Sequence, residues 1–277
     1  MSVLAEAAEL ATARLGNEVN HLTIDRLVIG LFFTGVKLDN GFAGTSFTPS
    51  KDIPEAVCCP SSVGRTFDPV TVSGRKVTEI LPALESPEPI KRAVAVATLN
   101  ALSAMCWSKG LTGGHRLRER ADAQDYIKIR SEYSVAVFGA MVPILRMLKK
   151  RGGTWWVIEQ DPKTLKDDEL PHYVPWGQSE EIIRKADALI ITGVSLLNRT
   201  LEPILSLAGA GAEIAVLGPT ASMLPEPMFR RGVRVVGGVW VKRPDELLNV
   251  LASGGSGYHL FDEIATRIVW ERELWPQ

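Results

Sequence analysis

The stretch that decides the fold is DALIITGVSLLNRTLEPILSLAGAGAEIAVLGPT, residues 187–220. Its apolar runs at 187–193 and 212–218 each end in a glycine, and both predict buried strands. The segment between them has the apolar spacing of a helix, and a strand, a helix and a second strand are typical of a parallel α/β sheet. Ligands of such sheets bind outside the carboxyl ends of the strands, so the same stretch predicts the position of a pocket.

Regular alternation continues on both sides of this stretch. The segments SVAVFG, TWWVIE and VRVVGGVWV, at 134–139, 154–159 and 233–241, predict three further strands with helical segments between them. Five strands separated by helices predict a doubly wound parallel sheet, which is the Rossmann-like arrangement. We assign this domain to residues 126–277.

The first part of the chain has a different pattern. A helix at about 4–16, two or three strands between 25 and 47, and helical patterns from about 76 and 90 predict a small α+β domain over residues 1–115. The stretch LTGGHRLRERADAQD, from about 111 to 125, is polar and charged, so we expect it to form a linker. The predicted fold class is therefore α/β, with a small α+β domain followed by a Rossmann-like domain.

The composition argues against several kinds of partner. The chain has 277 residues, a formal net charge of −1 and 45% hydrophobic residues. A nearly neutral chain has no overall field that attracts nucleic acid or a membrane surface, so we expect neither as a partner. No run reaches the roughly 18 to 20 apolar residues of a membrane span, which predicts a cytoplasmic location. The sequence leaves open whether the chain forms a homo-oligomer.

The first two strands of the C-terminal domain raise the question of a dinucleotide cofactor. Glu159 stands 20 residues after Gly139, the spacing at which a dinucleotide-binding fold places the acid that holds a ribose. However, the turn reads GAMVP, residues 139–143, and lacks the later glycines that let the backbone approach a pyrophosphate. NAD is therefore disfavoured. Gly139 and Glu159 remain candidates for a ligand site, beside the alternative of a turn glycine and a solvated strand end.

Asn100 is a polar residue in an apolar helical pattern, IKRAVAVATLNALSAM, residues 90–105. It shares a helical face with Ala93 and Ala97, so we expect its amide to be buried. A buried amide must find partners or cost about 1–3 kcal/mol. Asn100 either ties down a neighbouring backbone segment or faces a polar pocket between the domains, and both interpretations remain open.

Polar residues and glycines follow two of the predicted strands. They are Thr192, Asn198 and Thr200 after the first, and Gly218 and Thr220 after the second. Each of these residues has an ordinary explanation as a helix cap or a turn residue. Because the strand ends converge on one edge of the sheet, the same groups also predict a ligand site with hydroxyls and free N–H groups for an anionic moiety.

A preformed metal site cannot be read from the sequence. The four histidines show no HxH or HxxxH spacing, Cys58 and Cys59 are adjacent, and Cys106 stands alone. We therefore name no metal ligand, and the cofactor is left open between a metal ion and an oxyanion.

Three segments resemble a family of uncharacterised proteins to which heavy-metal chelation has been ascribed: TLNALS (98–103), ADALIITGVSLLNRTLEPIL (186–205) and LGPTASMLPEPMFRRGVRVVGGVWV (217–241). The resemblance implies an enolase-N-terminal-like domain joined to a Rossmann-like domain, with the site in the cleft between them. The cleft residues that it implies are Asn100, Glu159, Thr192, Asn198, Thr200, Gly218 and Thr220.

Three hypotheses about function follow. The first is a protein that binds a small ligand, a metal complex or an oxyanion in the interdomain cleft, because carboxylate, amide and hydroxyl groups suit such ligands better than a bare soft metal. The second is an enzyme acting on a small polar metabolite, with a nucleotide or S-adenosyl type cofactor against Glu159. The third is a scaffold whose cleft is only a domain interface.

Overall fold

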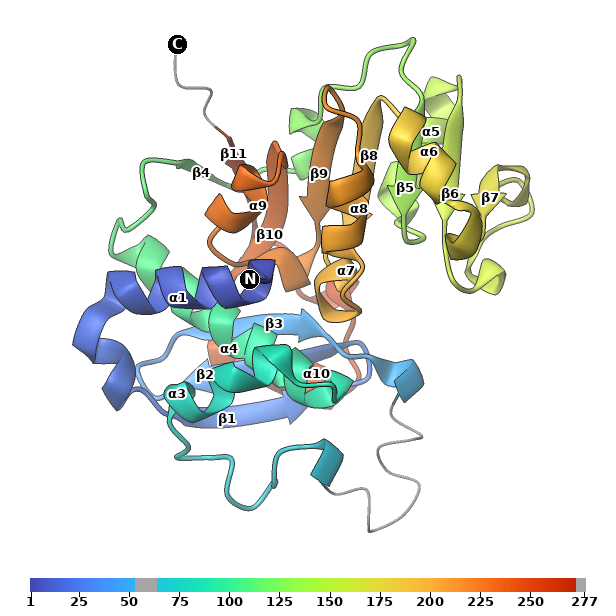
Figure 1. Ribbon diagram of the computed structural model, residues 1–277. Helices are drawn as coiled ribbons and strands as arrows, with labels where there is room; N and C mark the ends of the chain where they lie inside the picture. The colour runs from blue at the N-terminus through green and yellow to red at the C-terminus, as the bar shows by residue number, and fades with distance from the viewer. Residues whose placement is uncertain (53–63, 273–277) are drawn as a thin grey trace.

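The computed structural model describes residues 1–52 and 64–272. Within these ranges the protein has an eight-stranded sheet and a three-stranded sheet, drawn in the upper and lower parts of Figure 1. The large sheet is mostly parallel and the small sheet is antiparallel, which confirms the predicted α/β class. No helix in the described ranges is both long enough and apolar enough to cross a membrane.

The large sheet contains all five strands predicted for the C-terminal part of the chain. In spatial order its strands are β4 (Arg116–Glu119), β11 (Ala265–Glu271), β10 (Val235–Val241), β9 (Glu213–Leu217), β8 (Ala188–Thr192), β5 (Val135–Phe138), β6 (Trp155–Ile158) and β7 (Tyr173–Val174). The run from β10 to β7 is parallel, and β11 and β4 add an antiparallel edge. The central strands are apolar throughout because helices cover both faces of a parallel sheet.

The order of the parallel strands creates a switch point between β5 and β8. From β5 the chain passes through helix α5 (Val142–Arg151) to β6 on one side, and β8 later pairs with the other side of β5. Such a reversal opens a crevice at the carboxyl ends of the two strands. Gly139 follows β5 with φ +94°, and a Cβ on it would lie 3.0 Å from the Thr192 Cγ2 atom. Glycine is therefore required where the two strand ends come together.

Further helices connect the strands of the large sheet. They are α6 (Glu180–Lys185), α7 (Val194–Leu197), α8 (Leu201–Leu207), α9 (Glu226–Arg230) and α10 (Pro244–Ala252). Helix α7 follows β8 directly, so the predicted helix after this strand is divided into two short pieces, α7 and α8. The division matters for the site, because it separates the polar residues that follow β8.

The small sheet is a meander of β1 (Ile24–Ile29), β2 (Phe33–Leu38) and β3 (Ala43–Phe47). Helix α4 (Pro89–Ser108) packs on one face, and α1 (Val3–Leu15) packs on α4 (Figure 1). The short helix α3 (Val77–Ile80) lies beside α4. At Gly44 a Cβ would lie 2.2 Å from the Ala97 carbonyl oxygen and 2.4 Å from the Ala101 nitrogen. The backbones of β3 and α4 therefore touch, and a side chain at Gly44 would separate them.

The opposite face of the small sheet is covered by α10, from the far end of the chain. A Cβ on Gly35 of β2 would lie 2.7 Å from side-chain atoms of both Leu248 and Leu251. Leu247 and Leu251 are fully buried in a cluster with Ala43 of β3. The division into domains 1–115 and 126–277 stays a prediction. Helix α10 belongs to the second of these ranges and packs on the small sheet, which belongs to the first.

The structure differs from expectation in the stretch predicted as a linker. Residues 116–119 form strand β4, which pairs antiparallel with β11 at the edge of the large sheet. Arg118 Nε lies 2.6 Å from the Glu271 carboxylate. An edge strand exposes one side and much of its length to water, so it can be as polar as a linker. Composition alone therefore misled the prediction here.

Candidate functional site

A cavity of about 390 Å³ opens at the carboxyl ends of β5, β8 and β9, between the two sheets. Its volume lies within the roughly 300 to 1,000 Å³ of small-molecule sites. The turns after β5, β8 and β9 form one wall, and Phe33 and Phe47 of the small sheet stand in another. Phe33 and Phe47 are cross-strand partners, so the two rings lie side by side and together form part of the cavity wall.

The charged groups of the wall are already paired with one another. Arg267 lies 3.0 Å from the Asp122 carboxylate and 2.9 Å from the Asp262 carboxylate. The hydrogen bond with Asp262 holds the pKa of Arg267 above its usual value, so it stays charged. Asp122 also accepts a hydrogen bond from the backbone N–H of Gln124. These charges stabilise the wall, and a ligand meets mainly apolar surface with a few polar groups.

Three of the residues predicted for the site line the cavity: Thr192, Gly218 and Thr220. The Thr192 hydroxyl accepts only a long 3.4 Å contact from Val194 N, so its own proton is available to a ligand. Gly218 has φ +125°, a conformation that favours glycine, and its N–H donates to the Gly237 carbonyl. The Thr220 hydroxyl accepts from Phe47 N at 2.9 Å and so ties the cavity loop to the small sheet.

Gly139 and Glu159 lie beside the cavity, not in its lining. The Glu159 carboxylate accepts hydrogen bonds from Ala140 N at 3.0 Å, Gln160 N at 2.7 Å and Asp161 N at 3.3 Å. In a dinucleotide-binding fold, an acid at this point holds the ribose hydroxyls. Here its oxygens close the turn after β5. The 20-residue spacing therefore reflects a backbone tie in this protein.

Asn100 is buried under the cavity and holds one of its loops. Its side-chain nitrogen donates to the Thr45 carbonyl at 2.7 Å, the Thr220 carbonyl at 3.1 Å and the Pro219 carbonyl at 3.3 Å. The amide thus joins α4, β3 and the loop after β9. Of the two interpretations from the sequence, the geometry agrees with the backbone tie, because Asn100 is absent from the described lining of the cavity.

Asn198 and Thr200 are not brought to the cavity. Helix α7 lies between them and Thr192, and Asn198 is exposed at the end of that helix. The Asn198 Oδ1 atom accepts from Thr200 N at 3.2 Å and Thr200 Oγ1 at 2.7 Å, while Thr200 makes no side-chain cap for α8. The sequence explains both residues as caps of a helix that starts at Leu201, and α8 does start there. The turn of α7 lies between this helix start and the strand end, so both residues lie away from the cavity.

Several lining residues were not predicted from the sequence. Phe33, Phe47, Phe261 and Arg267 all face the cavity. A usable signal existed for the first two, since phenylalanines at the open ends of two adjacent strands of a hairpin share one position along the sheet. Nothing in the local sequence marks Arg267, because strand β11 was itself not predicted.

The described residues contain no group of three or more His, Cys, Asp or Glu side chains that could hold a metal ion. Cys58 and Cys59 lie outside the described residues. Cys106 is a free, buried cysteine, and burial raises the pKa of its thiol to about 11. This thiol is therefore protonated at neutral pH and is not poised to bind a metal.

Comparison with known proteins shows the family to which the chain belongs. Two family models with the same description, "Putative heavy-metal chelation", match residues 12–103 and 122–270. The chain belongs to this family. Two structures of family members of unknown function superpose on nearly the whole of this chain. The protein from Pyrococcus horikoshii has TM-score 0.75 and 22% identity over 98% of this chain and 100% of its own. The protein from Desulfitobacterium hafniense has TM-score 0.72 and 16% identity over 97% and 99%.

A curated relative is also similar in sequence. An uncharacterized protein of Methanocaldococcus jannaschii is 29% identical over 154 residues, which is 55% of this chain and 55% of the relative. The chain thus spans about half the length of the curated relative that it matches. The solved structures support the shared fold of the heavy-metal chelation family, and none of these relatives carries a named activity.

Proposed function

We propose that the protein binds a small organic ligand, or a metal ion already held by an organic chelator, in the cavity between the two sheets. The observation that carries the proposal is the position of this cavity at the switch point between β5 and β8, where α/β sheets bind ligands. Phe33 and Phe47 complete the cavity from the small sheet, so the site depends on both parts of the chain.

The lining favours a chelated metal over a bare ion. A bare divalent ion needs several anionic or imidazole ligands converging on one point. The described residues hold no such group, and the carboxylate of the lining, Asp122, is engaged by Arg267. An organic chelator supplies the metal ligands itself, and an aromatic chelator also presents an apolar outer surface. Such a complex suits phenylalanine walls and agrees with the description of the family.

The test is a calorimetric titration of the full chain with three kinds of probe. They are divalent metal chlorides, the same metals as citrate complexes, and the same metals as 1,10-phenanthroline complexes, with free phenanthroline as the reference. We expect the phenanthroline complexes or free phenanthroline to bind more tightly than the bare metals. Absence of binding tighter than millimolar for every probe would remove the proposal.

A pair of threonine variants locates the binding. Thr192→Val removes a cavity hydroxyl whose only hydrogen bond among the described residues is long, so stability should hardly change. Affinity for a probe that accepts this hydrogen bond should fall by about 0.5–1.5 kcal/mol, or roughly 2- to 12-fold. Thr154→Val, at the opposite end of the sheet before β6, is the matched control and should leave affinity unchanged. Equal affinities for both variants would place the site elsewhere.

The enzyme alternative can be examined in the same preparation. A nucleotide or S-adenosyl cofactor would have to reach Glu159, whose carboxylate already accepts three backbone N–H groups. A thermal-shift screen with NAD, NADP, ATP and S-adenosylmethionine tests this hypothesis, because a ligand that binds the native state raises the melting temperature. A clear shift for any of these compounds would favour catalysis.

A further inference from the structure

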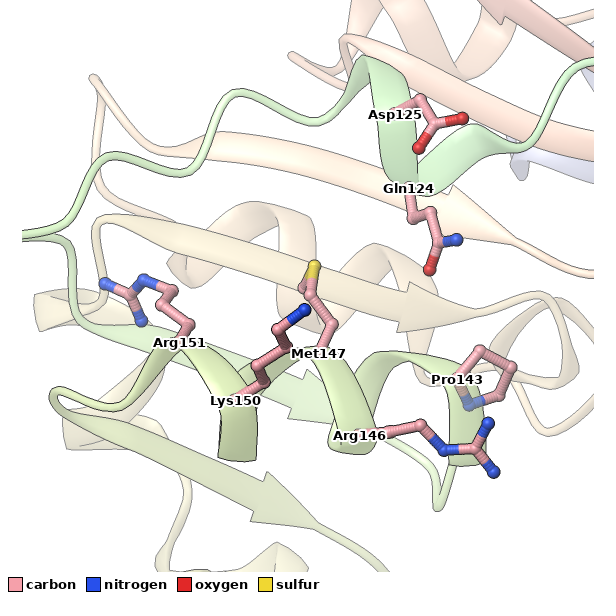
Figure 2. Close-up of a pocket in the computed structure, with 7 residues that line it drawn as sticks. All are labelled: Gln124, Asp125, Pro143, Arg146, Met147, Lys150 and Arg151. Carbon is pink, nitrogen blue, oxygen red and sulfur yellow. The ribbon is translucent and has the colours of Figure 1, made fainter.

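A second hollow of about 620 Å³ lies next to the cavity, along one face of α5. Figure 2 shows its lining, with Pro143, Arg146, Met147, Lys150 and Arg151 on α5 and Gln124 and Asp125 on the segment across from it. Gln124 and Pro143 line both spaces, so the hollow continues the cavity toward the surface. A ligand longer than the cavity would leave it along this path.

The basic residues of α5 divide into two kinds. Lys149 binds the carboxylates of Asp168 and Glu169, both at 2.9 Å, and Arg151 donates to backbone carbonyls at 130, 131 and 133. In contrast, Arg146 and Lys150 are exposed and have no hydrogen bond or ion pair with any described residue. Both line the hollow. Of the three cations that line the hollow, Arg151 is engaged by backbone carbonyls, and Arg146 and Lys150 are the two without a partner among the described residues.

The spacing of Arg146 and Lys150 suits a shared anion. Residues four apart lie on the same face of a helix, and like charges at this spacing destabilise it by about 0.2–0.5 kcal/mol. An anion bound between them removes this repulsion. The N-terminal turn of α5 faces the cavity, and its free N–H groups add positive potential at that end. Asp125 contributes one carboxylate across the hollow, which leaves the two cations in excess.

We infer that the ligand of the cavity is amphipathic: an apolar, ring-like body fills the cavity, and an attached phosphate, sulfonate or carboxylate binds Arg146 and Lys150. The inference rests on the proposed function, since it adds an anionic subsite to the same binding site. Arg146 supplies a planar pair of donors for such an anion, and Lys150 supplies a mobile ammonium group.

Two fluorescent probes that differ by one anionic group test the inference on the full chain. N-phenyl-1-naphthylamine is uncharged, and 1-anilinonaphthalene-8-sulfonate carries a sulfonate on the same ring system. We expect the two probes to displace each other and the sulfonate to bind at least fivefold more tightly. The preference should shrink in high salt, because salt screens exposed charges. Excess inorganic phosphate should weaken only the sulfonate probe.

The variant that decides the question is the double substitution Arg146→Gln with Lys150→Gln. We expect it to abolish the preference for the sulfonate and to leave the affinity of the neutral probe unchanged. The matched control is Arg184→Gln with Lys185→Gln on α6, which makes the same change in net charge on exposed residues outside both linings. It should keep the preference.

The outcomes separate the two proposals. Binding of the neutral probe without a preference for the sulfonate would overturn the anionic subsite and leave the cavity proposal standing. An equal loss in the α6 control would also overturn the subsite, because the effect would then follow net charge alone. If neither probe binds, the cavity proposal fails and the subsite fails with it.

Discussion

Replacing Asn100 by aspartate tests the central tie of the structure without changing its shape. The Asn100 side-chain nitrogen faces three carbonyl oxygens at 2.7, 3.1 and 3.3 Å, and the residue is only 2% exposed. Asn100→Asp puts an oxygen where the donor was, so acceptors would face acceptors. The same substitution at Asn198 is the matched control, because Asn198 is exposed and its Oδ1 atom acts only as an acceptor toward Thr200.

The size of the effect follows from burial. Loss of the donor removes this partner from the buried Thr45 and Thr220 carbonyls, which costs about 1–3 kcal/mol, while the Pro219 carbonyl still accepts from the Ser222 hydroxyl. The introduced carboxylate is also buried without a compensating charge, which raises the total loss in the free energy of unfolding to about 3–5 kcal/mol at pH 7. Asn198→Asp keeps both of its hydrogen bonds and should change the free energy of unfolding by less than about 0.5 kcal/mol.

Urea unfolding at several pH values measures this difference. Burial beside carbonyl oxygens raises the pKa of the introduced carboxyl above its unfolded value of about 4. The folded variant then binds more protons than the unfolded chain, so its stability relative to the wild type should rise as the pH falls toward 4. A penalty at position 100 no larger than at 198, or one independent of pH, would refute the assignment of the amide as a buried donor.

Two further substitutions test packing and charge. Gly44→Ala should destabilise the protein by about 2–4 kcal/mol in urea unfolding, because its Cβ would lie 2.2 Å from the α4 backbone. Gly211→Ala, which meets no atom within 4 Å, is the control and should be nearly neutral. Hydrogen bonds from Arg231 and Arg230 lower the pKa of Glu6 from 4.5 to about 2, so the carboxylate stabilises the fold above pH 4.5 and this stability is lost as the pH falls toward 2. Glu6→Gln should therefore cost about 1–2 kcal/mol at pH 7 and nearly nothing near pH 2, and a cost independent of pH would contradict the pairing.

The fold class was predictable because it depends on local patterns of apolar and polar residues. Five of the six parallel strands are apolar runs that end in glycine or a polar residue, and all of these five except β6 are followed by an α-helix before the next strand. The sequence does not predict strand β11, ATRIVWE. The strand contains the polar residues Thr266 and Arg267, and no recognisable turn sequence bounds it. The composition of strand β4 is typical of a linker, because an edge strand is free to be polar.

The candidate site was predictable where it depends on strand ends. Thr192 is the last residue of β8, Gly218 and Thr220 lie in the turn after β9, and the sheet brings these strand ends together. The hairpin pattern could have paired Phe33 with Phe47, but it could not place the pair at the cavity, because no local pattern tells which face of the small sheet meets the large one. Asn100 was recognised as buried, but its three carbonyl partners come from distant segments, and only the folded chain shows that it donates to them.

The position of α10 has a consequence for how the protein is made. A ribosome releases β1, β2 and β3 early, but the helix that covers Gly35 and the neighbouring apolar surface is formed by Pro244–Ala252. Until these residues emerge, one face of the small sheet is bare, and such nascent surfaces are the ones that chaperones protect. Since Phe33 and Phe47 belong to the same sheet, the cavity gains its aromatic wall late in translation. The cavity is therefore complete only after α10 has been synthesised.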